Sequence, residues 1–95
     1  MSWIIVLTAS AQRDLRRLDR PVATRILDAL SRLADTGQGD VTRLQGFSNE
    51  WRLRVGDWRV RFRNDHPTRM LEVLRILPQL TAVSKVRKTR IMDPT

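Results

Sequence analysis

An alternating stretch, residues 51–63, constrains the fold of this chain more than any other feature of its sequence. Every second residue in it is large and apolar: Trp51, Leu53, Val55, Trp58, Val60 and Phe62. Outside a central Gly-Asp turn, the residues between them are arginines: Arg52, Arg54, Arg59, Arg61 and Arg63. Because successive side chains of a strand point to opposite faces, the pattern predicts a β-hairpin with one apolar face and one arginine face. Like charges that face each other across two strands destabilise the pair, so we expect this face to meet a polyanion.

The charge balance supports the same interpretation. The formal net charge is +8, from 18 Lys and Arg against 10 Asp and Glu, and the excess lies in the hairpin and in residues 85–90. Such an excess is typical of chains that bind nucleic acid or an acidic protein.

Length and residue usage limit the remaining function classes. The 95 residues predict one domain, residues 1–95. The chain has no cysteine and one histidine, so we expect no disulfide, no thiol catalysis, no metal site and no cofactor. The apolar run at residues 3–7 is too short to span a bilayer and lacks the features of a signal peptide, so we expect a cytoplasmic protein without membrane contact.

The first half of the chain predicts a strand followed by two helices. The strand occupies residues 3–7, and Thr8 or Ser10 is placed to cap a short helix. Pro21 suits the first turn of a second helix, and Gly37 suits its left-handed end. The expected buried face of that helix consists of Val22, Ile26, Leu30 and Leu33.

The second half predicts consecutive strands. Residues 38–49 are loop-like with a short extended piece at 41–44, and the arginine hairpin follows. Residues 70–77 are apolar enough for a strand covered on both faces, which Pro78 ends, and a helical, basic segment is expected from Gln79 onward. This order predicts an α+β fold, with two N-terminal helices on one face of a small, mainly antiparallel sheet and a basic C-terminal segment.

Two motifs resemble the RelE/ParE superfamily of bacterial toxins, and most closely its RelE-like branch. The first is Thr-x-x-Ala-x-x-x-Leu-x-x-Leu, which begins at Thr8, and the second is Leu44-x-Gly46 followed by the arginine hairpin. The resemblance covers nearly the whole chain. It implies the RelE-like toxin fold and the toxin component of a type II toxin–antitoxin module. RelE-like toxins cleave mRNA in the ribosomal A site without a metal, by attack of the ribose 2′-hydroxyl on the adjacent phosphate.

The resemblance also assigns roles to residues of this chain. Arg52, Arg54 and Arg59 occupy the positions of the basic catalytic residues, where guanidinium groups would stabilise a phosphorane with extra negative charge. Arg61 and Arg63 share their face, and we expect them to bind RNA.

The C-terminal end departs from the family pattern. The family places an arginine and then a tyrosine there, where this chain has Gln79 and Lys85, and the chain contains no tyrosine. Arginine is a poor proton acceptor at neutral pH, so Lys85 is the remaining candidate for a catalytic general base. Gln79, Arg87 and Lys88 are expected RNA contacts.

Several of these residues also have a purely structural interpretation. Arginines on an exposed strand are commonly solvated, and the hairpin aromatics Trp51, Trp58 and Phe62 are on the face expected to pack in the core. His66 lies in an Asn-Asp-His-Pro turn, a poor place to hold a proton acceptor, so we expect a surface turn residue.

Three functions therefore compete. The first is a ribosome-dependent mRNA interferase, with the 70S ribosome and mRNA as partners. The second is a ParE-like toxin that inhibits DNA gyrase, and the third is a catalytically degenerate homologue that only binds its antitoxin. In each case the resemblance implies a cognate antitoxin whose acidic or amphipathic segment covers the basic face, and a toxin–antitoxin complex that binds operator DNA through the antitoxin.

Overall fold

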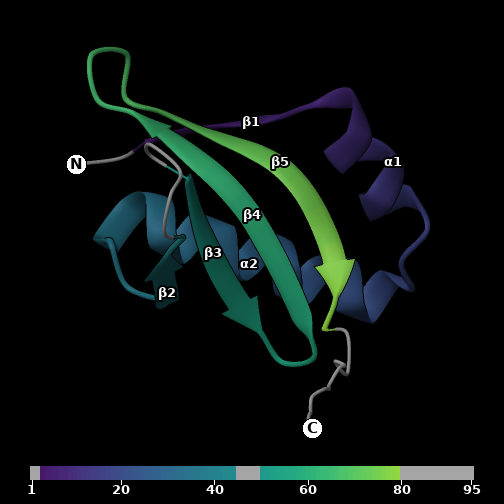
Figure 1. Ribbon diagram of the computed structural model, residues 1–95. Helices are drawn as coiled ribbons and strands as arrows, with labels where there is room; N and C mark the ends of the chain where they lie inside the picture. Colours follow the sequence, from purple (N-terminus) through teal and green to yellow (C-terminus); the bar gives the residue numbers. More distant parts are fainter. Residues whose placement is uncertain (1–2, 45–49, 80–95) are drawn as a thin grey trace, which may run out of the picture.

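The computed structural model describes residues 3–44 and 50–79, and it has the predicted order of elements (Figure 1). These elements are β1 (Ile4–Leu7), α1 (Ala9–Arg16), α2 (Arg20–Thr36), β2 (Asp40–Arg43), β3 (Glu50–Val55), β4 (Trp58–Asp65) and β5 (Met70–Pro78). The expected C-terminal helix, with Lys85, Arg87 and Lys88, lies outside the described residues.

Local signals set the helix ends as the sequence predicts. The Thr8 hydroxyl accepts a hydrogen bond from the Ala11 N–H at 3.1 Å and caps α1. Pro21 lies in the first turn of α2, where its missing N–H would have no helical partner. Gly37 ends α2 with φ of 77°, a left-handed conformation that costs glycine little, and its N–H bonds to the Leu33 carbonyl at 2.9 Å.

The five strands form one sheet in the order β1-β5-β4-β3-β2. β1 pairs with β5 in parallel, and the other neighbours are antiparallel. α2 runs behind the sheet and α1 lies beside the C-terminal half of β5, so the helices leave one sheet face open (Figure 1). The expectation of an α+β fold with a mainly antiparallel sheet is confirmed.

The core lies between α2 and the apolar side of the hairpin. Ile26, Leu30, Leu53, Val60 and Phe62 are almost completely buried. Burial of each such side chain contributes about 1.5–3 kcal/mol to folding. Trp51 and Trp58 are half-buried and pack against this core, as the alternation predicts.

One expectation about β5 is wrong. The apolar sequence predicts a strand covered on both faces, but only Leu71, Val73 and Ile76 are buried, and the residues between them are partly exposed. The reason is that helices pack on one face of the sheet only (Figure 1). The side chains on the other side of β5 therefore stay in contact with solvent.

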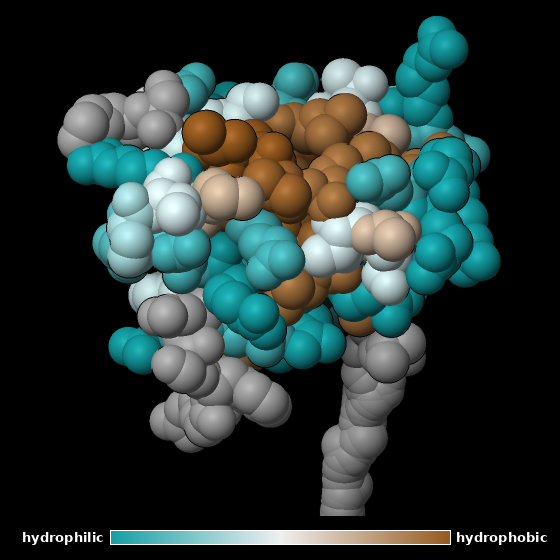
Figure 2. Space-filling model, turned by 90° about the horizontal axis from the view of Figure 1, so that it is seen from above, coloured by the Kyte–Doolittle hydropathy of each residue, from teal (hydrophilic) through white to brown (hydrophobic). Residues whose placement is uncertain are grey.

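Hydrophobic side chains also reach the surface. Seen from above, they gather in a patch bordered by hydrophilic residues (Figure 2). Ile4 is 62% exposed and Leu27 40%. Exposed apolar patches on small proteins commonly mark contact sites for other molecules. In the part of the chain that the structure describes, no helix is long and apolar enough to cross a membrane.

Candidate nucleic-acid interface

The register of the hairpin brings its arginines into opposed pairs. Arg52 of β3 lies opposite Arg61 of β4, and Arg54 lies opposite Arg59. These pairs are directly across from one another, so their like charges oppose strand pairing. An anion bound between them would remove this repulsion.

The five arginines of this face differ in what they contact. Arg59 is anchored at the turn, because its Nη1 donates to the carbonyls of Gly56 at 3.2 Å and Trp58 at 3.0 Å. Arg63 forms an exposed ion pair with Glu72 at 3.6 Å. Arg52 and Arg54 form no ion pair with the described residues, so their guanidinium groups remain available to a ligand.

Arg61 is held by a buried carboxylate, Glu50, which is only 5% exposed. Its Oε2 accepts a hydrogen bond from Arg61 Nε at 2.7 Å and forms an ion pair with Arg61 Nη2. Sequence reasoning missed Glu50. The signal was present, because Glu50 precedes Arg52 by two positions and therefore shares its side of the strand.

A groove of about 610 Å³ lies between the arginines and the end of β5. It is lined by Arg52, Arg59, Arg61, Leu77, Pro78 and Gln79. Among the expected site residues, the structure therefore brings together Arg52, Arg59, Arg61 and Gln79. Arg54 and Arg63 do not line this arginine groove, and Lys85, Arg87 and Lys88 lie outside the described residues.

The arginine groove suits anion binding and charge stabilisation. A guanidinium presents several N–H donors in a plane and binds phosphate oxygens in pairs, and it stays protonated at neutral pH. The lining side chains named above include no carboxylate, histidine or lysine, so the described part of the groove supplies no ordinary proton acceptor. His66, the one histidine of the sequence, is an exposed residue of the β4–β5 turn, and its ring meets that of Trp3 in a T-shaped contact with 5.2 Å between the ring centroids. It therefore lies at the opposite end of β4 from the groove.

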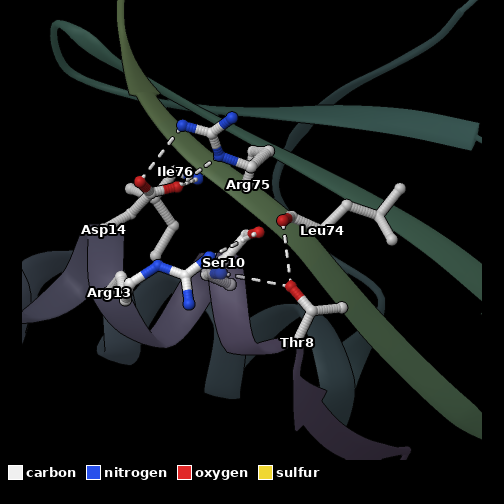
Figure 3. Close-up of polar contacts among 8 residues, drawn as sticks. Thr8, Ser10, Arg13, Asp14, Leu74, Arg75 and Ile76 are labelled. Carbon is white, nitrogen blue, oxygen red and sulfur yellow. Dashed lines mark hydrogen bonds and ion pairs between the residues drawn. The ribbon is translucent and has the colours of Figure 1, made fainter.

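The wall of the groove on β5 is fixed by contacts from α1 (Figure 3). β1 ends at Leu7, so the C-terminal half of β5 lacks a neighbouring strand on that side. Thr8 replaces it in part: its N–H donates to the Val73 carbonyl at 3.1 Å, and its hydroxyl donates to the Leu74 carbonyl at 3.0 Å.

Asp14 of α1 completes this attachment. Its carboxylate accepts hydrogen bonds from the Ile76 N–H at 2.9 Å and from Arg75 Nε at 2.8 Å and Nη2 at 3.2 Å. The hydrogen bonds from Arg75 hold the pKa of Asp14 below its usual value. Burial raises this pKa and so opposes the shift, whereas the hydrogen bond from the Ile76 N–H lowers it further. At neutral pH Asp14 is therefore an ionised acceptor that holds the strand leading to Leu77, Pro78 and Gln79.

Comparisons with known proteins agree with this architecture. The family model described as "ParE toxin of type II toxin-antitoxin system, parDE" matches residues 5–82. No curated protein matches the sequence significantly.

Three solved structures illustrate the structural similarity. The RelBE2 toxin–antitoxin complex from Mycobacterium tuberculosis matches with a TM-score of 0.72 and 20% identity, over 82% of this chain and 99% of that chain. The archaeal RelE–RelB complex from Pyrococcus horikoshii OT3 gives 0.71 and 21%, over 83% and 97%. A YoeB/ParE toxin from Agrobacterium tumefaciens gives 0.69 and 22%, over 81% and 99%. At this level of identity these matches show a shared fold.

Proposed function

This chain belongs to the ParE toxin family of type II toxin–antitoxin systems, within the RelE/ParE superfamily, and we propose that it acts by cleaving mRNA in the ribosomal A site. The observation that carries this proposal is the arginine groove, because Arg52, Arg59 and Arg61 come from two strands and line one hollow. Guanidinium groups that line one hollow suit the oxygens of a phosphate, because each presents paired N–H donors and a permanent positive charge.

The proposed reaction uses the ribose of the RNA as nucleophile. The 2′-oxygen attacks the adjacent phosphorus, the 2′-hydroxyl proton goes to a base, and the bond from phosphorus to the 5′-oxygen breaks as that oxygen is protonated. Negative charge increases on the phosphate in the transition state, where preorganised donors stabilise it most. Arg59 suits this role because the two turn carbonyls already hold its guanidinium in place.

The other arginines have supporting roles in the proposal. Arg52 is without an ion pair among the described residues, so it would bind the phosphate without first leaving a partner. Glu50 holds the Arg61 side chain in position, and its negative charge partly offsets the positive charge of that guanidinium group. Arg54, opposite Arg59, and Arg63 would contact the RNA backbone outside the groove. Lys85 remains the predicted proton acceptor.

A second candidate function is inhibition of DNA gyrase. Two observations favour it: the matching family model is the ParE one, and the described lining of the groove contains no ordinary proton acceptor. In that case the arginine groove would bind an acidic surface or DNA in the gyrase complex. Acute expression would then cause DNA damage and filamentation, whereas an mRNA interferase stops protein synthesis.

A cognate antitoxin is the proposed protein partner. The relatives from M. tuberculosis and P. horikoshii are themselves complexes of a toxin with an antitoxin. A segment that carries acidic residues would neutralise the arginine face, and apolar residues of the same antitoxin would cover the hydrophobic patch (Figure 2). Binding of operator DNA would then occur through the antitoxin.

Primer extension on mRNA in programmed 70S ribosomes tests the proposed activity. We expect the wild-type protein to cut at the A-site codon, and we expect no cut in the same RNA without ribosomes. Arg59→Ala should abolish the cut while thermal unfolding shows an intact fold. The matched control is Arg32→Ala, because Arg32 is an exposed arginine of α2 and does not line the groove.

The outcomes separate the candidate functions. Absence of cleavage by a folded protein that binds its antitoxin would refute the interferase proposal. Gyrase-dependent DNA damage in the same cells would support the second candidate, and a harmless protein would indicate a degenerate toxin.

A further inference from the structure

A second hollow adjoins the arginine groove at the end of β5. It has a volume of about 560 Å³ and is lined by Asp57, Trp58, Pro78 and Gln79. Pro78 and Gln79 line the arginine groove as well, so these two residues form a ridge between the two hollows. Two contacts define the ridge: Pro78 pairs with Trp58 across the sheet, and the Gln79 N–H donates to the Asp57 carbonyl at 2.6 Å.

The side chains of this second hollow differ in kind from those of the groove. Trp58 is half-buried, because it packs against the core and also lines this hollow, and the exposed Pro78 adds apolar surface. Asp57 is exposed and its carboxylate forms no hydrogen bond or ion pair with the described residues, although Arg59 is two positions away. Gln79 contributes an amide, which both donates and accepts.

The Gly-Asp pair suits a two-residue hairpin turn, but the Asp57 carboxylate itself makes no contact with the described residues that would hold the turn. Aspartate is common in turns because its side chain bonds to the nearby backbone. Here the turn is closed by other groups, since the Asp57 carbonyl accepts from Gln79 and the Arg59 guanidinium binds the Gly56 carbonyl at 3.2 Å. The carboxylate is therefore left available to a ligand.

We propose that the second hollow binds a nucleobase, with a preference for guanine, of the single-stranded RNA whose phosphate lies in the arginine groove. The inference rests on the proposed function in taking RNA as the ligand. An aromatic ring beside a positively charged groove is the usual arrangement for binding unpaired bases, since every base has a π-face that stacks on it. A phosphate and its neighbouring base would then lie on the two sides of the Pro78–Gln79 ridge.

The preference for guanine follows from the carboxylate. The Watson–Crick edge of guanine presents two adjacent donors, N1–H and the N2 amino group, which match the two oxygens of Asp57. Adenine and cytosine present one amino group beside a ring nitrogen that accepts. Uracil presents one N–H between two carbonyl oxygens, which a carboxylate repels.

Binding of short RNAs to the free protein tests this assignment. The probes are four trinucleotides, UGU, UAU, UCU and UUU, at one salt concentration. Dissociation constants come from NMR titrations that follow the Trp58 indole N–H and the Gln79 side-chain amide. We expect UGU to bind roughly tenfold tighter than UUU, the weaker end of the range for a paired contact to a base edge.

Asp57→Asn replaces one acceptor oxygen by an amino group of the same size, and asparagine is equally suited to a turn. We expect this variant to lose most of the guanine preference. The matched control is Asp65→Asn, which makes the same change at an exposed residue near the opposite end of β4 and should keep the preference. Circular dichroism melting curves establish that the variants are folded.

The result that would overturn the inference is equal binding of UGU and UUU by the wild type, or a folded Asp57→Asn protein that retains the preference. Because the assay contains no ribosome, it is separate from the test of the proposed function. A guanine preference without A-site cleavage would refute the interferase proposal and support the base site. Cleavage without a guanine preference would support the interferase proposal and refute the base site.

Discussion

Replacement of Asp14 by alanine should destabilise the protein more than its position on a surface helix suggests. Asp14 is 8% exposed, and its carboxylate is the acceptor for the buried Ile76 N–H. The variant leaves that N–H without its acceptor, which costs about 1–3 kcal/mol in the free energy of unfolding. The lost pairing with Arg75 adds less, because the Arg75 side chain is 43% exposed and water screens the interaction.

A loss of about 2 kcal/mol corresponds to a decrease in Tm of roughly 8–16 °C for a chain of this size. Urea unfolding at neutral pH measures the same change. The matched control is Asp28→Ala, which removes an exposed carboxylate of α2 and should change stability by less than about 0.5 kcal/mol. Arg75→Ala should cost less than Asp14→Ala, because Asp14 would still accept from Ile76.

The pH dependence gives a second test of the same contact. The folded-state pKa of Asp14 lies below its usual value of 3.8, chiefly through the hydrogen bonds from Arg75. The stabilisation that ionised Asp14 contributes to the folded state is therefore fully present above pH 3.8 and is lost as the pH falls through the folded-state pKa. The difference in stability between wild type and Asp14→Asn should be largest near pH 7 and should shrink below about pH 4. A constant difference from pH 7 to pH 3, or an Asp14→Ala protein as stable as the wild type, would refute the reasoning.

Three further predictions concern the core, the turn and the groove. Leu53→Ala should lower the free energy of unfolding by about 2–5 kcal/mol in urea titrations, because Leu53 is 1% exposed; a loss under 1 kcal/mol would mean that the core collapses around the site. Gly56→Ala should destabilise the hairpin by roughly 1 kcal/mol, because Gly56 has φ of 58° and an added Cβ would lie 2.9 Å from Arg25 Nη2; an unchanged Tm would contradict this geometry. Arg52→Ala should reduce the slope of log K against log salt for single-stranded RNA by about 0.7, and a slope equal to that of wild type would exclude a phosphate contact.

Local signals made much of the fold predictable. The alternation of arginine and apolar residues predicts the hairpin, its register and its buried side, because strand geometry allows a side chain only two directions. Thr8 and Gly37 define helix ends through contacts within a few residues, so the sequence is sufficient to identify them. The arginine face was predictable for the same reason.

The composition of the candidate site was less predictable, because it depends on the end of β5 and on α1. Arg54 and Arg61 look equivalent in the sequence, yet Arg61 lines the groove and Arg54 does not. Arg52, which lies on the same strand as Arg54, lines the groove too, so the distinction depends on where the end of β5 lies along the hairpin. No local pattern distinguishes Asp14 from the other acidic residues of the two helices, because its hydrogen bond to Ile76 joins residues that are 62 positions apart.

The sequence by itself therefore determined the order of helices and strands, the buried face of α2 and of the hairpin, and the concentration of positive charge on one side of that hairpin, whereas it did not determine which face of β5 is covered. These properties arise from interactions between near neighbours in the chain. Only the tertiary structure decided which arginines share a hollow, which carboxylate holds Arg61, and how α1 completes the unpaired half of β5. These properties depend on which strand ends beside which helix, and hence on contacts between distant residues that no local pattern encodes.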